Sequence, residues 1–209
     1  MNRRSFVGLS CAAGLDLMLN PVNAFSQVVQ TAAVDIDQIL LATQLQKCNS
    51  WCWAACLSTV FSFYNHPIDQ VEIVQNRFGG NIPCLGDPTA TAVVKYLNGT
   101  WTDDNGKRFT SKITASYDYN RSIFNMNNKD LIDTLKGGDP LFYGSVQHAM
   151  VICGADYFMV PGSPIPNVVR VKVVDPFPSA PRVHYLNNAE MIPRNLGGQM
   201  ILCASVEIT

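Results

Sequence analysis

Residues 46–64 read QKCNSWCWAACLSTVFSFY, and after Ser50 this stretch is almost continuously apolar. Two alanines and a leucine follow the second tryptophan and favour a helix, and the apolar run has the length of a helix rather than of a strand. A helix that is apolar on all sides is a buried one. We therefore predict a buried helix over 51–64. Either Asn49 or Ser50 can serve as its N-cap, which places Cys52 in the first turn.

Cys52 is placed for nucleophilic chemistry. The thiolate is the reactive form of cysteine, and the unpaired N–H groups at the beginning of a helix stabilise it through their partial positive charge. Attack on an amide carbonyl forms an oxyanion, which needs hydrogen-bond donors already aimed at it. The backbone N–H of Cys52 is one donor, and the side-chain amide of Gln46 can supply the second. The sequence predicts Cys52 as nucleophile, with Gln46 in the oxyanion hole.

Only three histidines are available as a general base. His66 precedes Pro67 at an expected helix start, which indicates a capping or surface residue. His184 lies on a late strand with nothing reactive beside it. His148 opens an apolar strand after a Gly-Ser-Val-Gln turn, so its ring can project from a strand end into a cleft. We predict His148 as the base, with His184 as the alternative.

An imidazole base works better when a third group holds its other nitrogen. Asp175 ends an apolar strand, and if this strand neighbours the one that His148 opens, the two side chains meet. Asp156 is the rival, but it falls at the far end of the strand that His148 opens. We therefore predict Asp175 as the orienting acid. The segment 158–166 between the two strands is expected to form a long hairpin loop that can overhang the cleft.

The remainder of the chain has helices first and strands later. Residues 27–45 are expected to form a short lead-in. Three further helices are bounded by capping and breaking residues; they cover 66–78, with Pro67 at the first position, then 87–99 and 128–136. The segments after Pro140 are short, rich in β-branched and aromatic residues, and typical of strands; they are 140–146, 148–155, 167–175, 181–186 and 199–208.

This order predicts an α+β fold in a single domain over 27–209. Its helical lobe covers about 40–138, and its lobe of one antiparallel β-sheet covers about 139–209. A cleft between the two lobes is the natural place for a site.

These motifs resemble those of the papain-like cysteine peptidases. Gln-x5-Cys-Trp-Ala, a His that opens an apolar strand and an Asp-Pro after a further strand follow one another in that order. The form Trp-Cys-Trp-Ala-Ala-Cys is similar to the bacterial group that includes the AvrRpt2-type effector peptidases, and to the C39-like peptidases. The resemblance covers about residues 40–208 and implies a helical lobe beside an antiparallel β lobe. It also implies the roles of oxyanion donor, nucleophile, base and orienting acid for Gln46, Cys52, His148 and Asp175.

Residues 1–26 have the layout of an export signal. Arg3 and Arg4 precede a moderately apolar stretch, and small residues offer cleavage after Ala24 or Ser26. The run Arg-Arg-Ser-Phe-Val resembles signals of the twin-arginine class. An ordinary N-terminal helix is the alternative. We expect an exported protein, either periplasmic or secreted.

Export brings the cysteines into a compartment that permits disulfides. One of the seven cysteines leaves with the signal, and if Cys52 is kept reactive the other five allow at most two bridges. One hypothesis pairs Cys48 with Cys84. Cys153 and Cys203 lie on late strands and either face each other or belong to the core. The resemblance implies no partner for Cys48, because this residue stands four positions before the nucleophile rather than three.

The composition of the chain argues against several classes of function. Charged residues make up 15% of the chain and the formal net charge is −1, so no surface for nucleic acid is expected. No apolar run reaches the roughly 18 residues of a membrane-spanning helix. Cys48, Cys52 and Cys56 recur at every fourth position, but no Cys/His cluster follows them. Neither a metal nor a cofactor is expected.

The sequence thus predicts a monomeric thiol protease that hydrolyses protein or peptide substrates through a Cys52–His148–Asp175 triad and a thioester. A deamidase or transglutaminase that acts on glutamine side chains with the same triad is one alternative. An inactive fold used for binding is another, although the intact set of Gln46, Cys52 and His148 argues against it. The substrate sequence cannot be read, because a fold does not set specificity.

Overall fold

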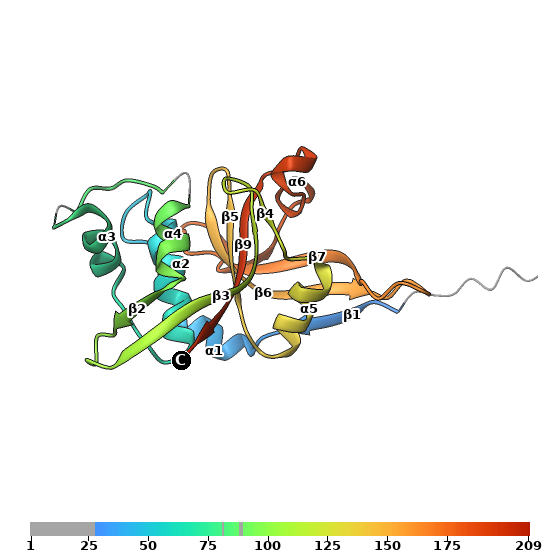
Figure 1. Cartoon of the computed structure of the whole chain (residues 1–209), viewed down its shortest axis with the longest axis horizontal. Coiled ribbons are helices and arrows are strands. Elements are labelled where there is room, and N and C mark those ends of the chain that lie inside the picture. The colour runs from blue at the N-terminus through green and yellow to red at the C-terminus, as the bar shows by residue number, and fades with distance from the viewer. Residues whose placement is uncertain (1–27, 81, 88–89) are drawn as a thin grey trace, which may run out of the picture.

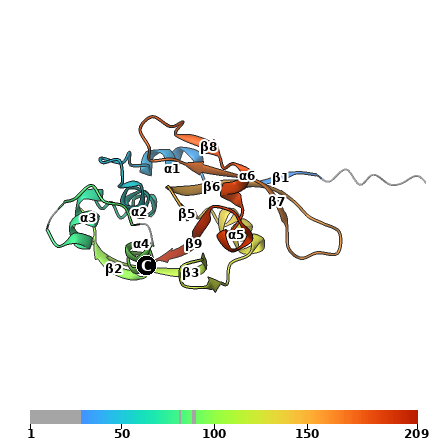
Figure 2. The ribbon, with the colours of Figure 1, turned by 90° about the horizontal axis from the view of Figure 1, so that it is seen from above.

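The computed structural model describes residues 28–209 except 81, 88 and 89 (Figure 1). The expected export signal over 1–26 therefore lies outside the described residues. The fold is α+β, with the N-terminal helices at one end of the molecule beside a largely antiparallel sheet, as the sequence predicts (Figures 1 and 2). No helix of the described part of the chain is both long and apolar enough to cross a membrane.

The apolar stretch forms the central helix α2 (Cys52–Phe63), which is buried along nearly its whole length. It packs against the sheet on one side and against the helices α1 (Ile36–Ala42), α3 (Gln70–Phe78) and α4 (Thr91–Tyr96) on others. The prediction of a buried helix is confirmed.

The cap of α2 differs from the expectation. Trp51 occupies the N-cap position, in place of Asn49 or Ser50, and no described side chain caps the helix. The turn before the helix is instead closed by the Trp51 N–H, which donates to the carbonyl oxygen of Cys48 at 3.0 Å. The N–H groups of the first turn are therefore not covered by a side-chain acceptor.

Nine strands of the described residues form one sheet, and all the pairs between these strands are antiparallel. The main path runs β2-β3-β9-β5-β6-β7-β8, while β1 pairs with β6 and β4 pairs with β3. The strands are β1 (Gln30–Ala33), β2 (Gly99–Thr102), β3 (Arg108–Asp118), β4 (Ile123–Phe124), β5 (Leu141–Ser145), β6 (Ala149–Phe158), β7 (Asn167–Val174), β8 (Val183–Tyr185) and β9 (Met200–Ile208). The five strands predicted after Pro140 are β5 to β9.

Capping residues help to set where the other helices begin and end. The second predicted helix begins at Gln70 rather than at Pro67, because the Asp69 side chain accepts from the Val71 N–H at 2.8 Å and makes the cap. It ends at Gly79, which has φ +71°, as predicted. The third helix is α4, shorter than predicted, and the fourth is α5 (Asn128–Lys136), with the predicted bounds.

Several elements were not predicted. Residues 28–45 hold β1 and α1, the predicted helical lobe contains β2, β3 and β4, and the short helices α6 (Asn188–Met191) and η1 (Arg194–Leu196) precede β9. β3 pairs with β9 along much of its length and so belongs to the sheet. The division of the lobes at about 138 therefore does not match the structure, since strands begin already at Gly99.

The hairpin loop 158–166 does not overhang the cleft. β6 begins beside His148 and runs away from it, so its other end lies roughly 30 Å along the strand. Figure 1 shows the β6–β7 hairpin pointing away from the helical end of the molecule.

Candidate active site

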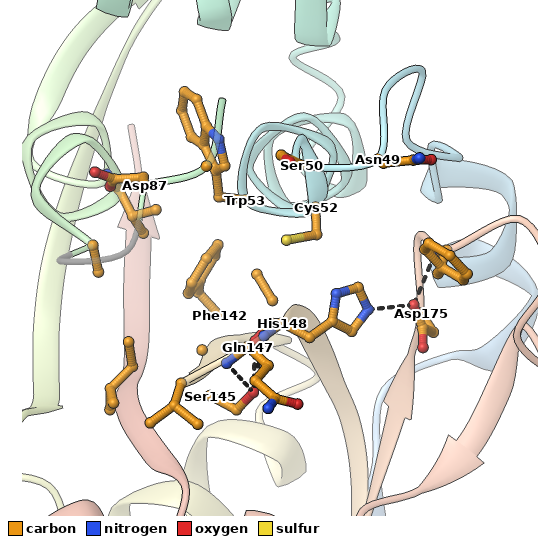
Figure 3. Close-up of a pocket in the computed structure, with 18 residues that line it drawn as sticks. Asn49, Ser50, Cys52, Trp53, Asp87, Phe142, Ser145, Gln147, His148 and Asp175 are labelled. Carbon is orange, nitrogen blue, oxygen red and sulfur yellow. Dashed lines mark hydrogen bonds and ion pairs between the residues drawn. The ribbon is translucent and has the colours of Figure 1, made fainter. Parts of the chain in front are cut away.

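A cleft of about 500 Å³ lies where α2 begins, opposite the turn between β5 and β6 and the end of β7 (Figure 3). Its lining includes Cys52 of α2, His148 of the turn, and Asp175 and Phe177 after β7. Segments far apart in the sequence therefore meet at the first turn of the central helix.

Cys52 is the first residue of α2 and is partly exposed. Figure 3 shows its side chain entering the cleft above the His148 ring, and a hydrogen bond with Cys52 contributes to the raised pKa of that ring. The uncapped beginning of the helix places partial positive charge beside this sulfur.

His148 and Asp175 come together through strand pairing. Val151 of β6 pairs with Val174 of β7, so the start of one strand lies beside the end of the other. The ring Nε2 of His148 lies 2.7 Å from Asp175 Oδ1, and the same oxygen accepts from the backbone N–H of Phe177 at 2.8 Å. The other ring nitrogen, Nδ1, faces Cys52 (Figure 3).

His148 and Asp175 each shift the pKa of the other toward the charged form. Burial alone would lower the pKa of His148, but hydrogen bonds with Asp175 and Cys52 and their negative charges raise it to about 9. Burial would raise the pKa of Asp175, but hydrogen bonds from His148 and the Phe177 N–H, and then the charges of His148 and His184, lower it. At neutral pH the arrangement therefore favours an imidazolium beside an ionised carboxylate.

Phe177 also contacts the His148 ring. The two ring centroids lie 6.2 Å apart with an interplanar angle of 88°, an edge-to-face contact. Phe177 was not predicted as part of the site, although Asp175-Pro176 marks the loop that carries it.

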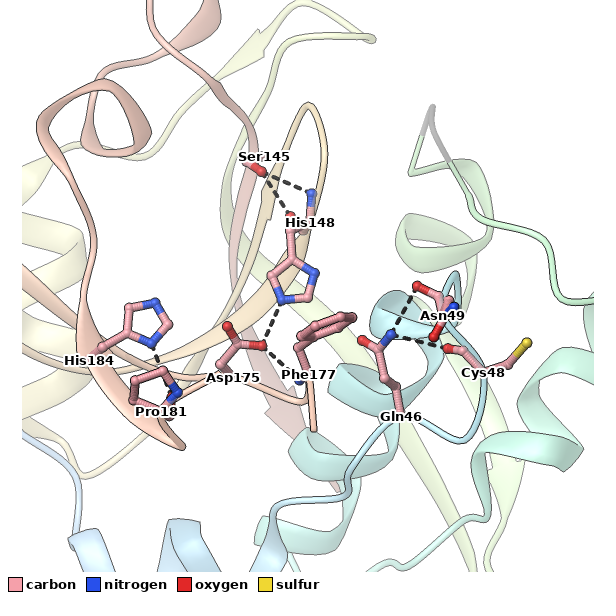
Figure 4. Close-up of polar contacts among 9 residues, drawn as sticks. All are labelled: Gln46, Cys48, Asn49, Ser145, His148, Asp175, Phe177, Pro181 and His184. Carbon is pink, nitrogen blue, oxygen red and sulfur yellow. Dashed lines mark hydrogen bonds and ion pairs between the residues drawn. The ribbon is translucent and has the colours of Figure 1, made fainter. Parts of the chain in front are cut away.

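The other two histidines take no part in the contact between His148 and Asp175. His184 is held by a hydrogen bond from Nδ1 to the carbonyl oxygen of Pro181 at 3.2 Å (Figure 4). It pairs with Val173 near the end of β7, and its charge helps to lower the pKa of Asp175. His66 is neither a surface nor a capping residue: it is buried, lies 2.9 Å from Asp103 and stacks on Phe109.

Asp156 takes no part in the cleft. As the sequence analysis anticipated, it lies toward the far end of β6, where it accepts from Thr31 and Arg170.

Gln46 lies at the junction between the loop before α2 and the loop after β7. Its backbone N–H donates to the carbonyl oxygen of Pro176 at 2.9 Å. Its side-chain Nε2 donates to the carbonyl oxygens of Cys48 at 3.1 Å and Asn49 at 2.9 Å (Figure 4). Oε1 is buried and has no hydrogen-bond partner among the described residues. Both amide hydrogens are thus held by the loop before α2 and not aimed at the cleft.

The turn that carries His148 was also missed as a feature of the site. Ser145 Oγ accepts from the N–H groups of Gln147 and His148 at 3.3 and 3.0 Å and donates to the His148 carbonyl oxygen at 3.1 Å. A serine that bonds its own turn is a common motif, so the Gly-Ser-Val-Gln sequence could have indicated it.

The loop before α2 is fixed by a disulfide between Cys48 and Cys84, the pairing that the sequence suggested. Two indoles reinforce it, because Trp51 Nε1 donates to the carbonyl oxygen of Pro83 at 3.0 Å and Trp53 Nε1 to that of Leu85 at 3.2 Å. The segment after Cys84 lines the cleft through Gly86 and Asp87.

The remaining cysteines of the described part are free. Cys56, Cys153 and Cys203 are buried, so Cys153 and Cys203 belong to the core and do not bridge. Among the described residues, no group of three or more His, Cys, Asp or Glu side chains could hold a metal ion.

Comparison with known proteins shows the family of the chain. The sequence model of a family described as papain-like cysteine protease AvrRpt2 matches residues 34–188, a range that contains Gln46, Cys52, His148 and Asp175. No curated protein and no solved structure gave a match. The match covers most of the chain, and the chain belongs to the AvrRpt2 family of papain-like cysteine proteases.

Proposed function

We propose that this protease hydrolyses peptide bonds with Cys52 as nucleophile, His148 as proton donor and acceptor, and Asp175 as the carboxylate that orients the imidazole. One observation carries the proposal: a thiol at the uncapped start of a buried helix faces Nδ1 of an imidazole whose Nε2 is held by a buried carboxylate at 2.7 Å. This is the geometry that acyl transfer by a thiol needs.

The steps follow from the two ring nitrogens. The Cys52 thiolate attacks the carbonyl carbon of the substrate, and the oxygen becomes an oxyanion. The carbon–nitrogen bond then breaks as the His148 imidazolium donates its Nδ1 proton to the leaving amine, which leaves a thioester. Neutral His148 next accepts a proton from water as the water attacks the thioester. The carbon–sulfur bond of this intermediate then breaks, the acid product leaves, and Cys52 is regenerated as a thiolate beside the imidazolium that now holds the proton from water. Asp175 keeps Nε2 protonated throughout.

The oxyanion that forms on the substrate needs hydrogen-bond donors aimed at it. The Cys52 N–H at the start of α2 is the first proposed donor, since no side chain competes for the first turn. Gln46 is the second. In the free protein its amide hydrogens bond Cys48 and Asn49, so one of these two hydrogen bonds has to be exchanged for a bond to the oxyanion.

We further propose that the protein acts as an exported monomer on protein or peptide substrates. The twin-arginine-like layout of residues 1–26 supports export. The Cys48–Cys84 bridge is consistent with it, because disulfides persist in oxidising compartments.

A peptide library read by mass spectrometry tests the activity. The wild-type protein should cleave backbones, and Cys52→Ala should lose at least ~10³-fold in rate because no other group takes the place of the nucleophile. Ser62→Ala, on the far turn of the same helix, is the matched control and should retain activity. Peptides that stay intact but gain the mass of deamidation would replace the proposal with glutamine chemistry. Equal cleavage by Cys52→Ala would refute the assigned nucleophile.

A further inference from the structure

We propose that Ser145 is a positioning residue for His148, in that its hydroxyl fixes the turn from which the imidazole projects. This inference rests on the proposed function of His148. Ser145 is the last residue of β5, is only 6% exposed and lines the cleft.

The turn is closed mainly through this one hydroxyl. Four hydrogen bonds join Ser145 to Gln147 and His148, and three of them use Oγ. The fourth is the backbone bond from the Ser145 N–H to the His148 carbonyl oxygen at 2.7 Å. Oγ uses its one hydrogen and two acceptor positions, which is the full capacity of a hydroxyl.

Two of the bonds that Ser145 Oγ makes are to the backbone of His148 itself. Both the N–H and the carbonyl oxygen of His148 are held by Ser145, so the peptide groups on either side of its Cα are fixed. The direction of the Cα–Cβ bond, and with it the position of the ring, follows from these two groups. The ring itself is held by the contact of Nε2 with Asp175 and by the hydrogen bond with Cys52, and neither contact fixes the direction of the Cα–Cβ bond.

The neighbouring strand holds the turn from its other side. The Val146 N–H donates to the carbonyl oxygen of Gln199 at 3.0 Å, just before β9. The pairing of β5 with β9 shifts register between Gly144 and Ser145, an irregularity that re-aims the end of the strand. Ser145 is therefore the point where a regular strand becomes the support of the base.

Loss of the hydroxyl should impair catalysis more than folding. Ser145→Ala leaves the N–H groups of Gln147 and His148 without their acceptor, and the turn relaxes. A displacement of a catalytic group by about 1 Å can cost ~10²-fold in rate. We expect kcat to fall ~10–100-fold while KM stays within about twofold, because the binding surface of the cleft is kept.

Steady-state kinetics on a cleaved peptide, together with the rate of Cys52 alkylation by iodoacetamide at mildly acidic pH, tests the proposal. Ser145→Ala should lower both kcat and the alkylation rate, and Ser145→Thr, which retains the hydroxyl, should restore most of each. Ser205→Ala removes an equally buried hydroxyl from the sheet and should leave kcat unchanged. Circular dichroism establishes that the compared variants are folded.

Three results would overturn the inference: wild-type kcat in Ser145→Ala, a raised KM with unchanged kcat, or Ser145→Thr as slow as Ser145→Ala. A parallel Cys52→Ala assay separates this failure from that of the proposed function. If Cys52→Ala is inactive and Ser145→Ala is fully active, only the role of Ser145 falls. If Cys52→Ala still cleaves, the assigned nucleophile falls with it.

Discussion

At the scale of single residues, the site depends on how three side chains alter one another. Burial would keep the His148 ring neutral, but Asp175 and Cys52 together outweigh burial and raise its pKa to about 9. The ring is therefore protonated over the neutral range. Asp175 remains ionised because its hydrogen bonds lower its pKa despite burial.

The activity should decline on the alkaline side as pH rises through about 9, because His148 then loses the proton that it donates to the leaving amine. In Asp175→Asn the carboxylate that raises the pKa of His148 is gone, so this alkaline limb should move to lower pH by about one unit or more. Profiles of kcat/KM against pH for both proteins check this. An alkaline limb unmoved in Asp175→Asn would show that the carboxylate does not act on the base.

Gln46 provides a second prediction at this scale. If one amide hydrogen is exchanged to the oxyanion, Gln46→Ala should lower kcat ~10²–10³-fold. Gln46→Glu keeps the shape but has no N–H donor when ionised, so it should be similarly slow. Single-turnover kinetics with an ester and an amide substrate measure the effect. Wild-type rates in Gln46→Ala would mean that the side chain only holds the loop through Cys48 and Asn49.

The meeting of Cys52, His148 and Asp175 could be anticipated from the sequence because it depends on features that a sequence displays. A long apolar run fixes the helix that carries Cys52, and the ends of two adjacent strands carry the other two residues. Ser145 was harder to see, because its importance comes from bonds within a turn. The orientation of the Gln46 amide could not be predicted, since it depends on where two backbone carbonyls point in the folded loop.

At the scale of elements, α2 and the segment that it is bridged to form one wall of the cleft. The Cys48–Cys84 disulfide joins residues with a sequence separation of 36. The indoles of Trp51 and Trp53 bind the same segment at Pro83 and Leu85. The beginning of α2, which carries Cys52, is thereby fixed to the segment around Cys84.

Reduction of this bridge should lower the free energy of unfolding by about 2–4 kcal/mol, because the unfolded chain regains the freedom of the closed loop. Chemical denaturation with and without reductant measures the loss, and Cys48→Ser with Cys84→Ser should reproduce it without reductant. The wild-type protein in reductant and the double variant should then unfold alike. An unfolding midpoint that reductant does not move would contradict this role of the bridge.

Helices and strands with strong local signals were predicted well, and elements that depend on pairing were not. α5 has a capping box between Asn127 and Asp130 and a glycine stop, both visible in the sequence. β3 has buried serines at positions 111 and 116, which dilute its apolar pattern. β1 has only four residues and becomes a strand by pairing with β6, a contact distant in sequence.

At the scale of the whole molecule, two polar contacts among the described residues join the loop before α2 to the region after β7. One is the backbone bond from Gln46 to Pro176, and the other runs from Arg182 Nη1 to the carbonyl oxygen of Thr43 at 3.4 Å. Together with the packing of α2 on β5 and β6, they set the distance between the helical end and the sheet. The cleft is therefore a consequence of how the two parts are docked.

Export should leave a shortened protein. If residues 1–26 are a signal, the secreted or periplasmic form should begin after Ala24 or Ser26, and intact mass measures this directly. Replacement of Arg3 and Arg4 by lysine should retain the full-length chain inside the cell, because the twin-arginine route reads that pair. A full-length chain in the exported fraction would contradict the signal assignment.

The most direct test of the account is the site of alkylation by iodoacetamide at mildly acidic pH, mapped by peptide mass spectrometry. Burial raises the pKa of Cys56 well above its usual value and those of Cys153 and Cys203 to about 11 and 12, so these thiols should not react. We predict rapid modification of Cys52 alone, and a rate reduced severalfold or more in His148→Ala. Modification spread over Cys52, Cys56, Cys153 and Cys203, the free thiols of the described residues, or a Cys52 rate that does not change in His148→Ala, would contradict the pairing of this thiol with the imidazole.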